Sequence, residues 1–324
     1  DSIGSGAGFE RFCVAGETDI ANASRAIREE EVASCESIGR TPLEFRVGTD
    51  ALAVVVNPAN DFVTNLTLEQ LALAFSTAET WADVDPSFPD EPIARYSPGT
   101  DSGTFDYFVE AVFDGDDGPI LASSGTQFSE DDNVLVQGVE GDTYAIGYFG
   151  YAYYLENAEL LTIIDIDGVE PTAESAEDGS YPLSRPLYIY SDGSIMQAKP
   201  QVADFINFYL TYVNEEIIDV GYFPASEAAL EEARIHWQVG MGLMEMPAME
   251  EEAMAEEEGA MAELPMSDPL AVTGDIVTAG SSTVFPLTER MVERYESEGF
   301  AGQVTVDSIG SGAGFERFCV AGET

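Results

Sequence analysis

The chain has very few positive charges. Lysine and arginine together number 12, against 61 aspartates and glutamates, and with one histidine the formal net charge is −49 at pH 7. Lys199 is the only lysine. A field of this sign repels nucleic-acid phosphates and acidic membranes within a Debye length. The sequence therefore predicts no nucleic-acid partner, and a site for an anion would have to overcome this field locally.

The chain also lacks long apolar runs. No stretch reaches the roughly 18 to 20 uninterrupted apolar residues of a membrane span, and the first residues lack the basic and apolar regions of a signal peptide. The carboxylates are scattered and are not grouped as a metal-binding loop, so they indicate hydration and solubility, with no metal and no cofactor. We expect a soluble chain, with any export signal outside it.

Cysteine is scarce too. The three cysteines are Cys13, Cys35 and Cys319, and the sequence around Cys319 repeats the sequence around Cys13. None lies in a CxxC or Cys/His metal pattern. Two interpretations stay open on chemistry alone: an oxidised pair in an exported protein, worth roughly 3 kcal/mol, or buried free thiols in a cytosolic one.

A perfect repeat is the most informative feature. Residues 1–18, DSIGSGAGFERFCVAGET, recur unchanged as residues 307–324. Residues 242–267 include an Ala, Glu and Met-rich run that predicts an acidic, solvated linker with at most a transient helix. Overlapping the two copies restores one ordinary order, with the linker first, then 268–324, then 19–241. A circularly permuted chain, a tandem array and an assembly artefact all remain possible.

Strand-like and helix-like patterns alternate, which predicts an α/β fold. The expected strands cover residues 51–58, 144–154, 160–167, 186–190, 274–280 and 303–310. The expected helices cover residues 105–113, 202–213 and 285–298, and one further helix carries Phe315, Phe318 and Cys319.

Short Ser, Thr and Gly runs stand three times between a strand and a helix. They are Gly280-Ser281-Ser282-Thr283, Ser311-Gly312-Ala313-Gly314 with its copy at residues 5–8, and Asp101-Ser102-Gly103-Thr104. Such junctions present backbone N–H groups, hydroxyls and the positive end of a helix dipole. Three of them aimed at one point would bind a tetrahedral oxyanion, whereas simple N-capping explains any one of them alone.

A fourth run, residues 19–25, ends with Ser24 and Arg25. A guanidinium offers a fork of donors that suits phosphate. A surface ion pair is the alternative role of Arg25 in so acidic a chain.

Together, GSSTVFPLTE, SIGSGAGFERFC, DIANASR, PGTDSGTFDYF, DDNVLVQGV, GYFGYAYY and LSRPLYIY closely resemble the phosphate-binding proteins of phosphate ABC importers. The resemblance covers nearly the whole chain apart from the acidic linker. It implies a two-lobed periplasmic-binding-protein type II fold, each lobe a mixed sheet flanked by helices, with phosphate in a cleft between them. It also implies high-affinity binding of inorganic phosphate, a membrane permease as partner, and no enzymatic activity. The expected location is periplasmic or extracellular, tethered through the acidic linker.

Further details follow from the same resemblance. A Cys13–Cys35 bridge is implied, with Cys319 as the duplicate of Cys13. The implied ligand residues are Ser282 and Thr283, Ser311 and Gly312 (or Ser5 and Gly6), Ser24 and Arg25, and Asp101, Ser102, Gly103 and Thr104. One departure concerns charge. The best-known branch has an aspartate in the place of Arg25 and an arginine just ahead of the serine aligned with Ser102, so Arg25 and Asp101 look exchanged.

The expected lobes follow the order of the strands. One comprises residues 1–49, 185–241 and 268–324, the last including the duplicate 307–324. The other comprises residues 50–184, and the chain is expected to cross between them near 51–56 and 186–190.

Three rival functions are weighed. A dinucleotide loop fails because Phe315 stands where the third glycine after Gly310 and Gly312 should fall. A serine hydrolase lacks a GxSxG elbow, and the sole histidine, His236, lies beside Trp237. A receptor for sulfate, molybdate or tungstate remains as the alternative function.

Overall fold

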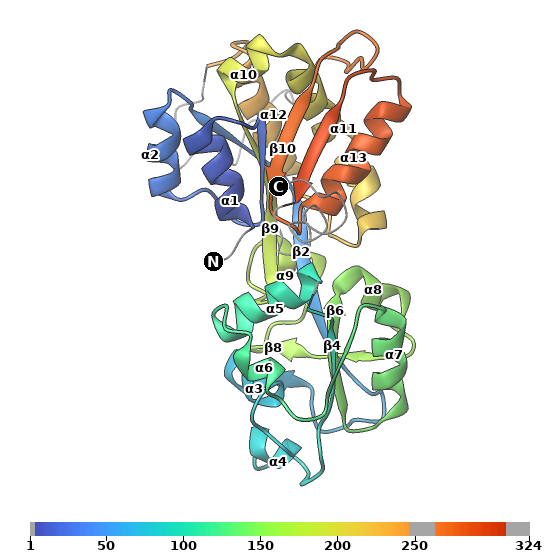
Figure 1. Cartoon of the computed structure of the whole chain (residues 1–324). Helices are drawn as coiled ribbons and strands as arrows, with labels where there is room; N and C mark the ends of the chain where they lie inside the picture. Colours follow the sequence, from blue (N-terminus) through green and yellow to red (C-terminus); the bar gives the residue numbers. More distant parts are fainter. Residues whose placement is uncertain (1–3, 101, 246–262, 309–324) are drawn as a thin grey trace, which may run out of the picture. The chain divides into compact units, whose positions relative to one another are not determined.

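The chain forms two compact units in this computed structural model, which describes residues 4–100, 102–245 and 263–308 (Figure 1). Unit 1 comprises Asp1–Gly48, Pro186–Val220 and Pro224–Thr324, and unit 2 comprises Thr49–Arg185 and Gly221–Phe223. Both units combine a sheet with helices, so the α/β expectation is confirmed. Gly221–Phe223 belongs to unit 2 because Phe223 and Thr49 exchange two backbone hydrogen bonds, of 3.0 and 2.8 Å.

The sheet of unit 1 has the strand order β11-β10-β1-β9. β10 is parallel to both β11 and β1, whereas β9 is antiparallel to β1. The elements are α1 (Ser5–Phe9), the π-helical turn η1 (Glu10–Ala15), β1 (Ile20–Ala23), α2 (Glu29–Ser37), the start of β2 (Pro42–Val56), β9 (Ser184–Asp192), α10 (Gly193–Ala198), α11 (Pro200–Val220), α12 (Glu227–Gly240), β10 (Ile276–Gly280), α13 (Phe285–Ser297) and β11 (Val304–Ser308).

Helices α11 and α13 pack through aromatic side chains. The ring of Tyr295 lies 5.2 Å from that of Phe205 and 5.0 Å from that of Phe208, centroid to centroid. Pro286 stands in the first turn of α13, where its missing N–H costs nothing. Gly299, with φ of 110°, follows its end. The helices predicted at 202–213 and 285–298 are thus confirmed.

The main sheet of unit 2 has the order β2-β6-β4-β5, with β7 also on β2, and β3 and β8 form a second, two-stranded sheet. β4 is parallel to β5 and β6, and β6 is antiparallel to β2. The elements are β2, β3 (Asn65–Leu66), α3 (Leu68–Ala74), α4 (Trp81–Val84), β4 (Ala94–Pro98), α5 (Gly103–Phe113), α6 (Gly118–Leu121), β5 (Thr126–Ser129), α7 (Asp132–Gly141), β6 (Ala145–Gly150), α8 (Tyr151–Glu156), β7 (Thr162–Ile163), β8 (Asp165–Ile166) and α9 (Ala173–Glu177).

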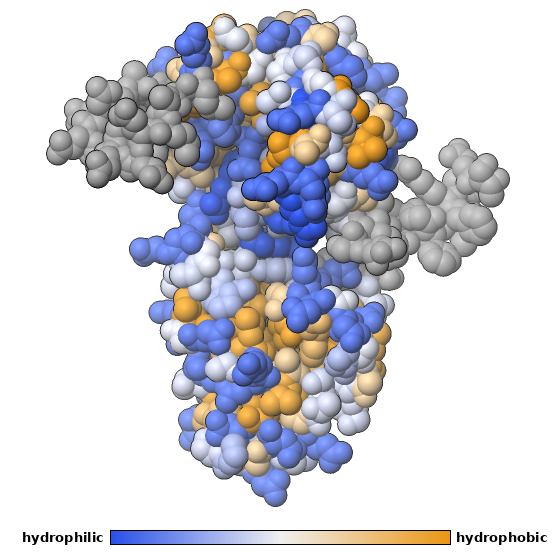
Figure 2. Space-filling view, turned by 90° about the vertical axis from the view of Figure 1, so that its left-hand side faces the viewer, coloured by the Kyte–Doolittle hydropathy of each residue, from blue (hydrophilic) through white to orange (hydrophobic). Residues whose placement is uncertain are grey.

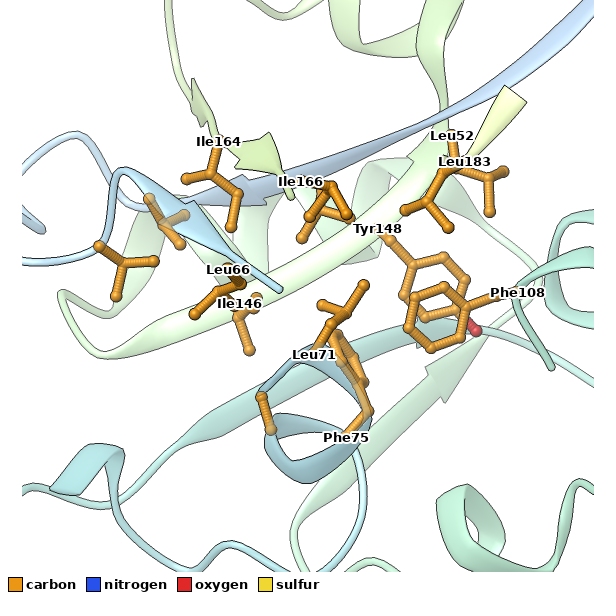
Figure 3. Packing of buried hydrophobic residues seen from close by; sticks show 14 of the residues in the cluster. Leu52, Leu66, Leu71, Phe75, Phe108, Ile146, Tyr148, Ile164, Ile166 and Leu183 are labelled. Atoms are coloured by element: carbon orange, nitrogen blue, oxygen red, sulfur yellow. The ribbon is translucent and has the colours of Figure 1, made fainter. Parts of the chain in front are cut away.

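Aromatic packing fixes α5 against this sheet (Figure 3). Phe108 of α5 stacks on Tyr148 of β6 with ring centroids 3.7 Å apart, and the edge of Phe75 meets both rings at 5.0 and 5.3 Å. Phe108 and Tyr148 are fully buried. The helix predicted at 105–113 is confirmed, and the middle of α5 packs on this sheet through an aromatic cluster.

Two predicted strands need correction. The strand predicted over 144–154 ends at Gly150, because α8 begins at Tyr151. The strand predicted over 160–167 is divided into β7 and β8, which belong to different sheets.

The last residues of the predicted acidic linker contact unit 1. The Asn207 side-chain amide donates to the Pro265 carbonyl (2.8 Å), and Gln238 donates to the Glu263 carbonyl (3.0 Å).

The surface of unit 2, the lower unit in Figure 2, shows hydrophobic residues set between hydrophilic ones. Exposed examples on this unit are Leu73, Leu121 and Leu155. Scattered apolar side chains of this kind are normal for protein surfaces. In the described part of the chain, none of the helices has the length and apolar character needed to cross a membrane.

Candidate functional site

The carboxyl ends of three parallel strands meet at one edge of the unit 1 sheet. Asn22 of β1 pairs with Gly280 of β10, and Gly280 pairs with Ser308 of β11. The residues that follow the strands, Ser24 and Ser281, therefore lie side by side. Ligands of open α/β sheets bind at such edges.

Three serine hydroxyls form a chain at this edge. The Ser281 hydroxyl donates to Ser24 Oγ at 3.1 Å, and Ser24 Oγ lies 3.3 Å from Ser5 Oγ. Ser5 Oγ also accepts the Ser24 backbone N–H at 3.0 Å. Ser5 is the first residue of α1. Three separate segments thus place hydroxyls within hydrogen-bond reach of one another, and each can donate to an anion or accept a proton.

Glycines allow these segments to approach. A Cβ on Gly8 would lie 2.7 Å from the Gly280 Cα, and a Cβ on Gly280 would lie 2.1 Å from the Asn22 carbonyl oxygen. Gly280 also has φ of 145°, which L side chains rarely adopt. The glycines predicted as part of phosphate loops therefore have a structural role in packing α1 onto β10 and β1.

In this loop the sequence predicts Ser282 and Thr283 as ligand residues, and it gives no such role to Ser281. Ser281 is buried, its backbone N–H donates to the Asn22 carbonyl at 2.9 Å, and its Oγ accepts the Thr283 N–H at 3.2 Å. Thr283 is buried and Ser282 is half-buried. The signal that could have found Ser281 is its place directly after the strand-ending Gly280.

Arg25 lies at the same edge, directly after Ser24. Its Nη1 and Nη2 donate to the two carboxylate oxygens of Glu31 at 2.9 and 2.7 Å, and Nη1 also donates to the Ala26 carbonyl at 3.0 Å. The guanidinium carbon lies 5.3 Å from the centre of the Phe9 ring. The structure thus contains an ion pair at Arg25, and it places Nη2 near α1, 3.9 Å from where a Cβ on Gly6 would lie.

The carboxylate of Glu31 is electrostatically tuned by these contacts. Partial burial tends to raise its pKa, but hydrogen bonds from the Arg25 guanidinium and the Arg28 backbone N–H, with the charges of both arginines, hold the pKa below its usual value. Glu31 is therefore an anion at neutral pH, and Arg25 has a permanent counter-charge.

A second contact anchors the loop after Arg25. The Ile27 N–H donates to the Tyr190 hydroxyl at 3.0 Å, and this hydroxyl donates to the carboxylate of Glu44. Burial, with help from the Glu44 charge, raises the pKa of Tyr190, so the phenol keeps its proton. Strands β2 and β9 thereby hold the loop that carries Ser24 and Arg25.

Unit 2 carries the remaining predicted ligand residues at the start of α5. Ser102 is the N-cap, and its Oγ accepts the Thr104 N–H at 3.2 Å. Ser102, Gly103 and Thr104 are half-buried, and they follow the carboxyl end of β4. The first-turn N–H groups of α5 and the helix dipole can therefore act on an anion at this point. Asp101 lies outside the described residues.

The N-terminal copy of the repeat occupies the place beside β1 and β10 as α1 and η1. The C-terminal copy contributes the end of β11, where Asp307 accepts a hydrogen bond from Arg11 at 2.8 Å. Ser311, Gly312, Cys319 and the helix predicted to carry Phe315 and Phe318 lie outside the described residues. Cys13 forms a disulfide with Cys35, so the predicted bridge is confirmed.

Comparison with known proteins adds the decisive observation. A family model described as a PBP superfamily domain matches residues 1–212. Protein SphX of Synechocystis is 43% identical over 248 residues, covering 73% of this chain and 72% of its own length. The phosphate-binding protein PstS of Staphylococcus saprophyticus is 40% identical over 225 residues, covering 68% of each.

The chain belongs to the PBP superfamily.

Solved structures agree with this PBP-superfamily membership. A possible phosphate-binding protein from Planctomyces limnophilus is 38% identical with a TM-score of 0.65, covering 73% of this chain and 85% of that one. An ABC-type phosphate transport receptor from Vibrio cholerae is 27% identical with a TM-score of 0.54, covering 68% and 85%. The two-lobed periplasmic-binding-protein fold expected from the sequence is thereby supported.

In this PBP-superfamily chain, the residues on which the two rival enzyme functions depend have other contacts. Nδ1 of His236 lies 2.7 Å from the Glu44 carbonyl oxygen, a contact with main chain and not with a serine. The N-terminal Gly-rich run forms α1 instead of a dinucleotide loop. Among the described residues, no group of three or more His, Cys, Asp or Glu side chains could hold a metal ion.

Proposed function

We propose that this protein is the substrate-binding component of an ABC phosphate importer and binds inorganic phosphate without transforming it. The observation that carries the proposal is the chain of Ser5, Ser24 and Ser281 hydroxyls beside Arg25, in a chain 40% identical to a protein named as phosphate-binding. The ABC-type phosphate transport receptor of Vibrio cholerae, which is similar in fold and sequence, supports the transport role.

The proposed chemistry suits a tetrahedral anion in a negative chain. Hydroxyls and backbone N–H groups donate hydrogen bonds without adding a fixed charge, and helix N-termini add partial positive charge. We propose Ser5, Gly6, Ser24, Arg25, Ser282 and Thr283 as the ligand residues of unit 1, with Ser281 added from its contacts. Asp101, Ser102, Gly103 and Thr104 are the proposed ligand residues of unit 2.

The proposal also includes the partner, the location and the tether of the protein. A membrane permease is the expected partner, the periplasm or cell exterior the expected location, and residues 242–267 the expected tether. The disulfide fits an oxidising compartment. We also infer that residues 268–308 precede residue 5 in the natural order of the module, because β11 ends where the repeated sequence leads into α1.

Calorimetry with phosphate, sulfate and molybdate tests the proposal. Phosphate should bind best, and Ser24→Ala and Ser281→Ala should each lose about 1.5–3 kcal/mol of binding free energy, the value of a hydrogen bond to a charged group. Ser34→Ala is the matched control, since this half-buried serine of α2 donates to the Glu30 carbonyl within its own helix. Tighter binding of sulfate or molybdate would instead support the alternative receptor, and no heat with any anion would refute the proposal.

A further inference from the structure

Arg25 is held by groups that are not themselves proposed ligands. Glu31 accepts hydrogen bonds from Nη1 and Nη2 at 2.9 and 2.7 Å, and the centre of the Phe9 ring lies 5.3 Å from the guanidinium carbon. A Cβ on Gly6 would lie 3.9 Å from Nη2, so this nitrogen is close to the proposed ligand residue of α1. Glu31, the Ala26 carbonyl and the Phe9 ring thus set the orientation of the guanidinium near α1.

Glu31 is itself rigidly placed. It is the third residue of α2, and its Oε2 accepts the Arg28 N–H at 2.8 Å, the reciprocal half of a capping box. Its side chain is 16% exposed, whereas that of the neighbouring Glu30 is 77% exposed and lies 3.9 Å from Arg28. Of these two glutamates, Glu31 therefore has a fixed orientation towards Arg25.

We propose that Glu31 is the positioning residue that makes Arg25 selective for phosphate, an inference that rests on the proposed role of Arg25 as a phosphate ligand. The bidentate pair uses two of the five N–H donors of a guanidinium and fixes its plane. It also cancels the cation's charge. Attraction common to all anions is thereby reduced, and hydrogen bonds that depend on geometry decide which anion binds.

The opposing effects of removing Glu31 make the inference testable. Losing the negative charge paired with Arg25 favours every anion at the site, whereas losing the orientation of Arg25 disfavours the one anion whose hydrogen bonds it fits. Glu31→Gln keeps the capping hydrogen bond, because glutamine serves in a capping box as well. The variant should fold, and a thermal melt checks this.

Binding of phosphate and sulfate to the full chain is measured for Glu31→Gln and for Glu30→Gln, which removes the same charge from the same helix. Glu31→Gln should weaken phosphate binding about ten-fold, as for residues that orient ligands at metal sites. It should not weaken sulfate binding, which is measured by competition. Glu30→Gln should change neither. An unchanged phosphate-to-sulfate ratio in Glu31→Gln, or an equal change in Glu30→Gln, overturns the proposal.

A double-mutant cycle with Arg25→Lys separates positioning from general stability. Lysine keeps the charge but cannot form the fork, so Glu31→Gln should have little further effect on the ratio in that background, whereas Glu31→Asp in the parent chain should recover part of it. An identical loss in both backgrounds would show that Glu31 does not act through Arg25. If the parent chain fails to bind phosphate, the proposed function itself fails, which is a different result from normal binding with an indifferent Glu31.

Discussion

Most of the few cations for which contacts are described are tied to carboxylates of the chain. Lys199 contacts Asp19 at 2.7 Å, Arg185 contacts Asp50 at 3.1 Å and Arg11 contacts Asp307 at 2.8 Å. Arg25 with Glu31 follows the same pattern. An anionic ligand therefore meets pre-neutralised cations, and this explains why hydroxyls and backbone N–H groups dominate the proposed ligand set.

The exchanged charges at Arg25 and Asp101 lead to a prediction. Arg25→Ala should cost more phosphate affinity than Asp101→Asn, because it removes donors and leaves Glu31 without its partner; we expect about 2 to 3 kcal/mol for a hydrogen-bonded charge. Asp101→Asn should instead weaken the rejection of sulfate, which has no proton to donate to a carboxylate. Titration calorimetry with both anions checks this. If Asp101→Asn still rejects sulfate fully, Asp101 does not discriminate between the anions by accepting the phosphate proton.

The contact between Arg25 and Glu31 could not be predicted from the sequence. Glu29, Glu30 and Glu31 are chemically alike. Which of them accepts the Arg28 N–H depends on Arg28 being the N-cap of α2. The usual signal of a capping box is absent, because arginine is not a normal N-cap residue. By contrast, the junction at Ser102 could be recognised, because a Ser, Gly and Thr run stands there just ahead of the helix predicted at 105–113.

The proposed site depends on the N-termini of two helices, α5 and α13. α5 begins at Gly103 with Ser102 as its cap, and α13 begins at Phe285 after the Ser281 loop. At α5 the cap hydroxyl satisfies a backbone N–H and lies beside the first-turn donors. One side chain can thus serve both the stability of the helix and the binding of an anion.

Ser102→Ala tests this double role. Loss of the cap should lower the free energy of unfolding by about 1 kcal/mol, and phosphate binding should weaken as well. Ser226→Ala removes the cap of α12, whose Oγ accepts the Ala229 N–H at 3.2 Å, and should cost similar stability without affecting phosphate. Denaturant unfolding and calorimetry measure the two effects. Equal phosphate binding by both variants would limit Ser102 to capping.

The limits of prediction among helices and strands have physical causes. Residues 144–154 are rich in aromatic residues throughout, which favours a strand, yet β6 pairs with β2 only as far as Gly150 and the chain turns into α8 at Tyr151. The surrounding fold overrides local strand propensity here. β10 and α13 were predictable because proline and glycine mark the limits of α13 and apolar residues fill β10.

The repeat determines how the chain as a whole is assembled. In the described residues, β11 ends in the first letters of the C-terminal copy, at Ser308, while α1 and η1 come from the N-terminal copy. The repeated sequence thus provides a strand end from one copy and a helix from the other. Arg11 and Asp307, one from each copy, contact each other at 2.8 Å.

Cys13 and Cys319 have the same neighbours in sequence, so they form a matched pair for a final test. The disulfide joins Cys13 to Cys35, and we therefore expect Cys319→Ser to leave stability and phosphate binding unchanged. Cys13→Ser should lower the free energy of unfolding by about 3 kcal/mol, the effect of opening a loop of this size. Thermal melts of both variants measure the difference.

Peptide mapping under non-reducing conditions decides between the copies directly. Cleavage after Arg11 and Arg317 places the two cysteines on peptides of different length, residues 12–25 and 318–324. The parent protein should give Cys35 linked to the longer peptide and Cys319 open to alkylation. A link from Cys35 to the shorter peptide would show that the C-terminal copy takes this place. In that case Cys13→Ser should be harmless, because an identical segment with its own cysteine would already pack against β1 and β10.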